Sequence, residues 1–175
     1  MNHLRTEVDG VDEPIKALQK YLYDNIVSYY DLNAFNGYGR VYKNKRNDMI
    51  VPEYYVSNKQ YKEVLLDSRL DGIMFFSTSS TSKAYGTLVI QPCDVMFTFN
   101  LSRLTDDNER DDEQVRQYVL WLLNQYTVNL GDKEIETDLR YVYRDYNGVS
   151  AYFYDMQPFH HFKIKIELRY NNKIC

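Results

Sequence analysis

Two segments of the chain repeat apolar residues at the spacing of an amphipathic helix. The first begins at Asp12, carries Pro14 in its first turn and is expected to end near Tyr30. Its apolar stripe consists of Ile15, Leu18, Leu22, Ile26 and Tyr29. The second follows an acid-rich stretch, and its stripe consists of Val115, Tyr118, Val119, Leu122, Leu123 and Tyr126. The sequence therefore predicts two principal helices, the second of which packs its apolar face on a sheet.

Two other segments alternate apolar residues with polar ones, which is typical of a strand. In 88–101 one face carries Val95, Phe97, Phe99 and Leu101. In 162–170 the apolar residues alternate with Lys163, Lys165, Glu167 and Arg169, which predicts a half-buried strand with one charged face. Shorter strands are predicted at 40–43, 50–56, 61–66, 72–76 and 127–130. Pro52 favours an edge or a bulge for its strand, and 135–146 fits either a short helix, which we favour, or a strand.

Turn-forming residues separate these elements. The glycines at 37 and 39 predict a turn after the first helix, and the polar segment 44–48 predicts a hairpin turn. A Ser/Thr run then lies between two strong strands, which predicts a long, flexible hairpin loop. The residues of interest are the run itself and two nearby residues on its C-terminal side: Ser77, Thr78, Ser79, Ser80, Thr81, Ser82, Lys83 and Tyr85. We consider this loop a candidate contact between subunits.

Helices and strands are segregated along the chain rather than strictly alternating. This order predicts an α+β fold in which two principal helices pack on a mainly antiparallel sheet. Residues 1–11 are polar without periodicity and predict a flexible N-terminal arm, and 12–175 predict a single domain.

The net charge and the composition of the chain limit the classes of function that it could have. The formal net charge of −4 argues against a dedicated duplex-DNA binder, although Arg40, Lys43, Lys45 and Arg46 form a short basic run around a turn. The 18 tyrosines suit either interfaces or a partly solvated sheet. No apolar segment is long enough to span a membrane, and the first residues lack the apolar region of a secretory signal. Cys93 and Cys175 form no disulfide framework.

Candidate catalytic and ligand-binding groups have simpler explanations. His160 and His161 are adjacent and would point to opposite faces of a strand, so they are poor joint metal ligands. No family signature surrounds Cys93, which favours a buried thiol over a nucleophile. The segment 140–144 alternates Arg with Tyr and is able to stack bases, but the overall acidity opposes that role.

Acidic residues cluster before the second helix. They are Asp106, Asp107, Glu109, Asp111, Asp112 and Glu113. Dipole complementarity at a helix start explains them better than a catalytic carboxylate pair. We expect no enzyme activity and no cofactor.

The order of elements resembles the tail-terminator and tail-completion proteins of tailed bacteriophages, from about residue 12 to residue 170. The helical stripes 15–29 and 115–126 and the strands 95–101 and 162–170 carry this resemblance. The stretches 40–44, 51–55, 72–76 and 155–160 also look like proteins of crAss-like phages. The family lacks invariant catalytic residues, so none is transferred to this chain.

The resemblance implies a structural protein of the virion, assembled in the host cytoplasm. Six or twelve copies would form a ring in the neck or tail, between a portal-side adaptor and the tail hub. DNA would pass through the ring without sequence-specific binding. Loop 77–87 and the sheet edges would contact neighbours by strand addition, with Arg40, Tyr42, Tyr54 and Tyr55 as candidate edge residues. Two alternatives are a monomeric module that grips a host or viral protein and an enzyme with a non-standard site.

Overall fold

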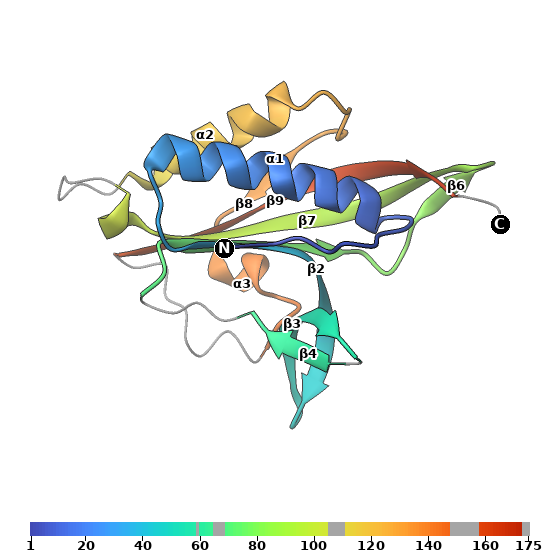
Figure 1. The fold of residues 1–175 in the computed structure, drawn as a ribbon, viewed down its shortest axis with the longest axis horizontal. Coiled ribbons are helices and arrows are strands. Elements are labelled where there is room, and N and C mark those ends of the chain that lie inside the picture. The colour runs from blue at the N-terminus through green and yellow to red at the C-terminus, as the bar shows by residue number, and fades with distance from the viewer. Residues whose placement is uncertain (59, 65–68, 105–110, 148–157, 173–175) are drawn as a thin grey trace.

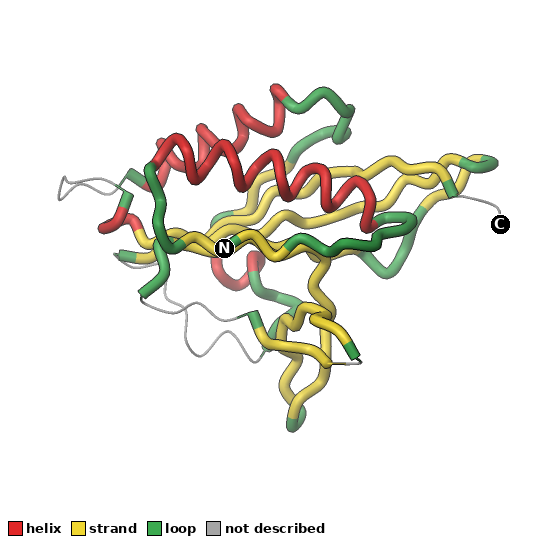
Figure 2. The backbone as a smooth tube through the Cα atoms, viewed as in Figure 1, coloured by secondary structure: helices red, strands yellow, loops and turns green. Residues whose placement is uncertain are grey.

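The computed structural model describes residues 1–58, 60–64, 69–104, 111–147 and 158–172 (Figures 1 and 2). Its helices are α1 (Asp12–Tyr30), α2 (Asp112–Gln125), α3 (Leu139–Val142) and the short 3-10 helix η1 (Leu101–Arg103). Its strands are β1 (Asn2–His3), β2 (Phe35–Arg46), β3 (Met49–Ser57), β4 (Gln60–Glu63), β5 (Gly72–Thr78), β6 (Lys83–Tyr85), β7 (Leu88–Asn100), β8 (Glu134–Glu136) and β9 (Phe159–Asn171).

The strands form one sheet in the order β4-β3-β2-β5-β7-β9-β8, with β1 added to β2 and β6 added to β7. The pairs β1–β2 and β2–β5 are parallel, and the remaining pairs are antiparallel. α1 and α2 cover one face of this sheet and α3 lies against the other (Figure 1). The predicted α+β fold, with two principal helices on a mainly antiparallel sheet, is confirmed.

Strand β2 belongs to two parts of the sheet. Its first half pairs with β5, and its second half pairs with β3 from Val41 to Arg46. The β3–β4 hairpin is therefore carried away from the main body (Figures 1 and 2). The turn between β2 and β3 consists of Asn47 and Asp48, both with positive φ, so the predicted turn at 44–48 is confirmed but is shorter.

The predicted turn at Gly37 and Gly39 is wrong, because both residues lie inside β2 at a shift of its register against β5. A Cβ atom at Gly37 would lie 2.9 Å from the ring of Tyr23 and 3.1 Å from the Cε of Met74. Glycine is needed here for close packing between α1 and the sheet rather than for a turn.

Pro52 also lies elsewhere than expected. Its strand, β3, has β2 on one side and β4 on the other, and is not an edge strand. Residues 127–130, predicted as a strand, are an irregular segment that leads to Gly131, whose φ is +70°. The ambiguous segment 135–146 divides between the end of β8 and α3. The predicted strand 61–66 corresponds to β4, and part of it lies outside the described residues.

The larger core lies between the sheet and the two principal helices. It contains the buried members of both predicted helical stripes and the predicted inner face of β7. The rings of Phe97 and Phe162 stack with centroids 5.0 Å apart, and Phe99 stacks on Phe35 at 5.5 Å. Tyr29, Tyr118 and Tyr126 lie at the rim of the stripes and are not fully buried.

Residues 1–11, predicted as a flexible arm, lie along the main body. Asn2 and His3 pair with Gly37 and Tyr38 of β2, and the His3 ring stacks on the Tyr38 ring at 4.6 Å. Arg5 then forms an ion pair with Asp12 at the start of α1, with 2.7 Å between nitrogen and oxygen. The segment thus connects the sheet to the first helix.

Candidate assembly interface

The Ser/Thr run at 77–82, predicted as a long hairpin loop, is divided between strands and a short irregular segment. Ser77 and Thr78 are the last residues of β5, and Lys83 and Tyr85 belong to β6. Both strands run along β7, so residues 79–82 form a short interruption between them rather than the hairpin tip. The tip consists of Gly86 and Thr87, and Gly86 adopts a φ of +62° with open space around its Cα.

The interruption at 79–82 is tied to β7. The side-chain amide of Gln91 donates to the carbonyl oxygens of Ser79 and Thr81 at 2.9 and 3.1 Å. The Ser79 amide donates to the Pro92 carbonyl at 3.0 Å. Ser77 lies further inside, where its hydroxyl accepts a hydrogen bond from Tyr146 at 2.9 Å. The Ser/Thr run is therefore partly structural, and its accessible part begins at Ser79.

The ends of β6, β7 and β9 together form a three-stranded projection, which we call the finger: residues 83–90 with 169–172. It extends beyond α1 at one end of the long axis of the molecule (Figures 1 and 2). Asn171 pairs with Leu88, and Leu88 pairs with Tyr85 across the tip. Tyr85 and Leu88 point to the same face because they are direct cross-strand partners. Their side chains expose 62% and 37% of their surface.

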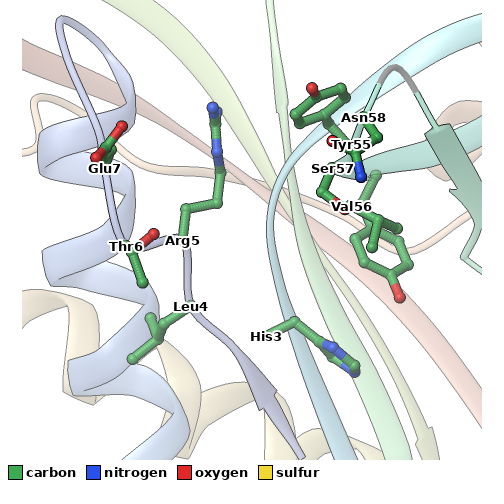
Figure 3. A pocket seen from close by; sticks show the side chains of 10 residues that line it. His3, Leu4, Arg5, Thr6, Glu7, Tyr55, Val56, Ser57 and Asn58 are labelled. Carbon is green, nitrogen blue, oxygen red and sulfur yellow. The ribbon is translucent and has the colours of Figure 1, made fainter.

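The other candidate residues lie around a groove at the junction of the two parts of the sheet. The groove has a volume of about 470 Å³ and is open between residues 3–7 and residues 54–58 (Figure 3). Tyr54 and Tyr55 line it, whereas Arg40 and Tyr42 lie on the neighbouring strand β2. β2 and β3 both lie inside the strand order, so Arg40, Tyr54 and Tyr55 are not on an edge strand. Tyr42 belongs to the second half of β2, which pairs with β3 on one side only.

These four residues are divided between two aromatic groups. Tyr54 packs with His3 and Tyr38, with ring centroids 5.3 and 4.8 Å away. Tyr42 and Tyr55 both contact the ring of Tyr61. Arg40 lies over the Tyr42 ring and also reaches Asp12, at 3.0 Å. These side-chain contacts connect residues 1–11, β2 and the β3–β4 hairpin.

The strands at the two ends of the strand order are β4 and β8. All four residues of β4, Gln60–Glu63, are exposed. β8 is only three residues long, and its acidic side chains Glu134 and Glu136 are engaged by Lys165. Short and charged edges discourage uncontrolled strand pairing.

A buried charge cluster on the α3 face was not predicted. Lys163 is only 1% exposed and contacts carboxylate oxygens of Asp94 at 3.3 Å and Glu136 at 2.9 Å. Burial opposes ionisation of Glu136, but hydrogen bonds from Lys165 and Lys163 outweigh it and lower its pKa. Nearby, the Thr98 hydroxyl lies 2.8 Å from both the Tyr143 hydroxyl and Nδ1 of His161.

The basic run predicted around the β2–β3 turn presents no group of unpaired cations. Its four side chains each contact a carboxylate, in the pairs Arg40–Asp12, Lys43–Asp145, Lys45–Asp48 and Arg46–Glu53. This pairing weakens the case for phosphate binding at the run. In the segment 140–144, Tyr143 is buried and Arg140 is paired with Asp138.

His160, His161 and Cys93 are buried. His160 and His161 lie inside β9 rather than before it, and they face opposite sides of the sheet as predicted: His160 lies beside Phe162 and His161 beside Tyr143. Cys93 lies within β7 in the larger core, and burial raises the pKa of its thiol. Among the described residues, no group of His, Cys, Asp or Glu is placed to hold a metal ion. Asp106, Asp107, Glu109 and Cys175 lie outside the described residues.

Comparison of the chain with models of protein families, with curated proteins and with solved structures finds no match. In the part of the chain that the structure describes, no helix is long and apolar enough to cross a membrane.

Proposed function

We propose that this protein is a structural subunit that assembles head to tail into a closed ring. Following the resemblance described above, the ring belongs to the neck or tail of a tailed bacteriophage and surrounds the DNA channel. Six or twelve copies would bridge the portal-side adaptor and the tail hub, and DNA would pass without sequence-specific contacts. The role is structural rather than catalytic.

The observation that carries the proposal is the finger. A projection that places Tyr85 and Leu88 in solvent loses the hydrophobic stabilisation that burial of these side chains would give. Contact with another protein recovers it, and exposed aromatic residues are typical of interfaces. Because the finger lies at one end of the long axis, a partner that holds it extends the assembly along that axis (Figure 1). Repeated contacts between unlike surfaces close into a ring when the rotation between subunits divides the circle.

The test is the molar mass of the purified protein, measured by light scattering after size exclusion over a range of concentrations. We expect a discrete species of several subunits in the wild type. The variant Tyr85→Glu should be monomeric, because it places a charge at the contact. Tyr141→Glu is the matched control, since Tyr141 is similarly exposed, at 54%, but lies on α3. Both substitutions should change the free energy of unfolding by less than about 0.5 kcal/mol.

A wild-type protein that stays monomeric at every concentration would contradict self-assembly. Equal loss of assembly in the two variants would contradict the assignment to the finger. The first outcome favours the alternative, a module that grips one host or viral protein.

A further inference from the structure

The end of the molecule opposite the finger carries a stack of exposed aromatic rings. α1 and α2 run antiparallel, because Tyr118 bonds to the carbonyl of Asn25 at 3.4 Å while Tyr21 bonds to that of Leu122 at 3.2 Å. The end of α1 therefore lies beside the start of α2. There the ring of Tyr118 stacks on Tyr29 at 4.0 Å and on Trp121 at 5.9 Å. We call Tyr29, Tyr118 and Trp121 the aromatic platform.

The platform is open to solvent and its shape is fixed. The side chains of Tyr29 and Trp121 expose 57% and 54% of their surface. Tyr30 supports the stack from below, with its ring edge-on to both Tyr29 and Tyr118. Rigid, exposed aromatic rings lose little conformational entropy on binding and often contribute most of the energy of an interface.

Among the residues that the structure describes, those beside the platform are mostly acidic. α1 has no basic residue in its last turn, so the negative end of its dipole is not offset. Asp31 follows directly as the C-cap residue, in a left-handed conformation. Asp111 is the N-cap residue of α2, and the start of α2 lies beside the end of α1, so this residue belongs to the same end of the helix pair as the rings. Arg116, the nearest cation on α2, is paired with Glu113.

The finger has the opposite character. Lys83 is the only charged residue in 79–92. It lies on the same face as Tyr85, two residues along β6, and opposite Ile90 on β7. This face of the finger therefore presents two apolar side chains, Tyr85 and Leu88, beside the ammonium group of Lys83. Arg169, which pairs with Ile90 on the same face, contacts Glu167 at 3.5 Å.

The two surfaces cannot meet within one molecule. β7 begins with Leu88 at the finger and ends with Asn100 near the start of η1. Its thirteen residues extend over about 40 Å at the usual rise of a strand. Figure 1 shows the finger at one end of the long axis and the start of α2 at the other.

We propose that the finger of one subunit docks on the aromatic platform of the next copy of the chain. Tyr85 and Leu88 pack against the rings of Tyr29, Tyr118 and Trp121, and the ammonium group of Lys83 faces Asp31 and Asp111. This proposal rests on the proposed ring and identifies the two surfaces that form its contact. Because the surfaces differ and lie at opposite ends, each subunit gives one contact and receives one.

The first experiment mixes two assembly-deficient variants. Tyr85→Glu removes the finger contact and keeps the platform, whereas Trp121→Glu removes the platform and keeps the finger. Each alone should be monomeric, and an equimolar mixture should form a heterodimer by light scattering, since one intact contact remains. A contact between two copies of the same surface predicts no such complementation and would overturn the proposal.

The second experiment traps the contact covalently. Two proteins, Tyr85→Cys and Trp121→Cys, each in a Cys175→Ser background, are mixed under mild oxidation. We expect their disulfide-linked heterodimer to form at least about tenfold faster than that of Tyr85→Cys with Tyr141→Cys, because docking raises the effective concentration of the paired thiols. Equal rates would overturn the proposal.

The outcomes separate the two proposals. If the wild type forms a ring and both glutamate variants still form it, the ring remains and the finger–platform contact is wrong. If the wild type is monomeric at every concentration and the 85–121 disulfide does not form preferentially, both proposals fail.

Discussion

The two faces of the sheet bury their side chains by different chemistry. Under α1 and α2, the face of β7 and β9 is apolar, with stacked rings of Phe97 and Phe162. On the α3 face, the same two strands bury Lys163 between carboxylates and His161 beside a hydroxyl pair. An apolar contact is non-directional, whereas a buried charge is tolerated only while its partners remain in place. Substitutions on the first face should therefore lower the free energy of unfolding according to the side-chain volume they remove. Substitutions on the second face should lower it when they remove a charged partner.

The largest loss of stability is expected from a substitution on the apolar face. Phe97→Ala removes a ring that is 1% exposed and leaves a cavity between β7, β9 and the helices. We expect a loss of about 3–5 kcal/mol in the free energy of unfolding, measured by urea denaturation. Phe97→Leu is the control, since it keeps most of the volume and should cost much less. Similar losses in both variants would show that volume does not govern this face.

A smaller effect is expected on the α3 face. Lys163→Met keeps the length of the side chain and removes its charge, which leaves Asp94 and Glu136 without this cation. Because Glu136 keeps Lys165, at 2.6 Å, we expect a loss of about 1–3 kcal/mol at neutral pH. The double variant Lys163→Met, Glu136→Gln should recover part of this loss. Strictly additive effects in this double-mutant cycle would contradict the coupling of the two residues.

The smallest expected effect is on the pH dependence of the free energy of unfolding. The pKa of Glu136 is lower in the folded protein than in the unfolded chain, so its ionised form contributes stability above the unfolded pKa. That contribution is lost as the pH falls through the folded pKa, below the ordinary value of 4.5. Urea denaturation of Glu136→Gln between pH 7 and pH 3 should give a shallower decline than the wild type. Parallel curves would exclude Glu136 as the source of this part of the pH dependence.

The same contrast explains what the sequence alone predicted. The bounds of α1 and the inner face of β7 follow from periodic apolar residues, and the structure confirms both. The alternation in β9 suggested a solvated charged face, but Lys163 is buried. Its partners come from positions 94 and 136, and only the pairing of β7, β8 and β9 brings them together. No local pattern signals a buried ion that is neutralised by distant strands.

Glycine and serine positions were misread for a related reason. Glycine is a typical turn residue, but at position 37 it lies in a strand. A larger residue would not fit there, because Tyr23 and Met74 approach the backbone closely. The Ser/Thr run has the composition of a loop, although its first two residues continue β5.

Parts of the candidate contact could be predicted from the sequence. Lys83 and Tyr85 were among the candidate contact residues. Leu88 was expected to be part of a strand, and its exposure at the finger depends on where the body of the protein ends. Tyr29 and Tyr118 were expected to belong to packed helical stripes, and the antiparallel pairing of α1 and α2 leaves them at a rim beside Trp121.

The finger is joined to the body by the longest strand pairing that the described residues form. β7 and β9 pair along thirteen residues each, from Leu88 with Asn171 to Asn100 with Phe159. A force that pulls the finger along its own axis acts parallel to these strands, so it loads many of their hydrogen bonds at once. A force that lifts the tip sideways opens the same bonds one after another. The molecule should therefore resist tension along its long axis far better than bending of the finger, which is the anisotropy that a link under axial load requires.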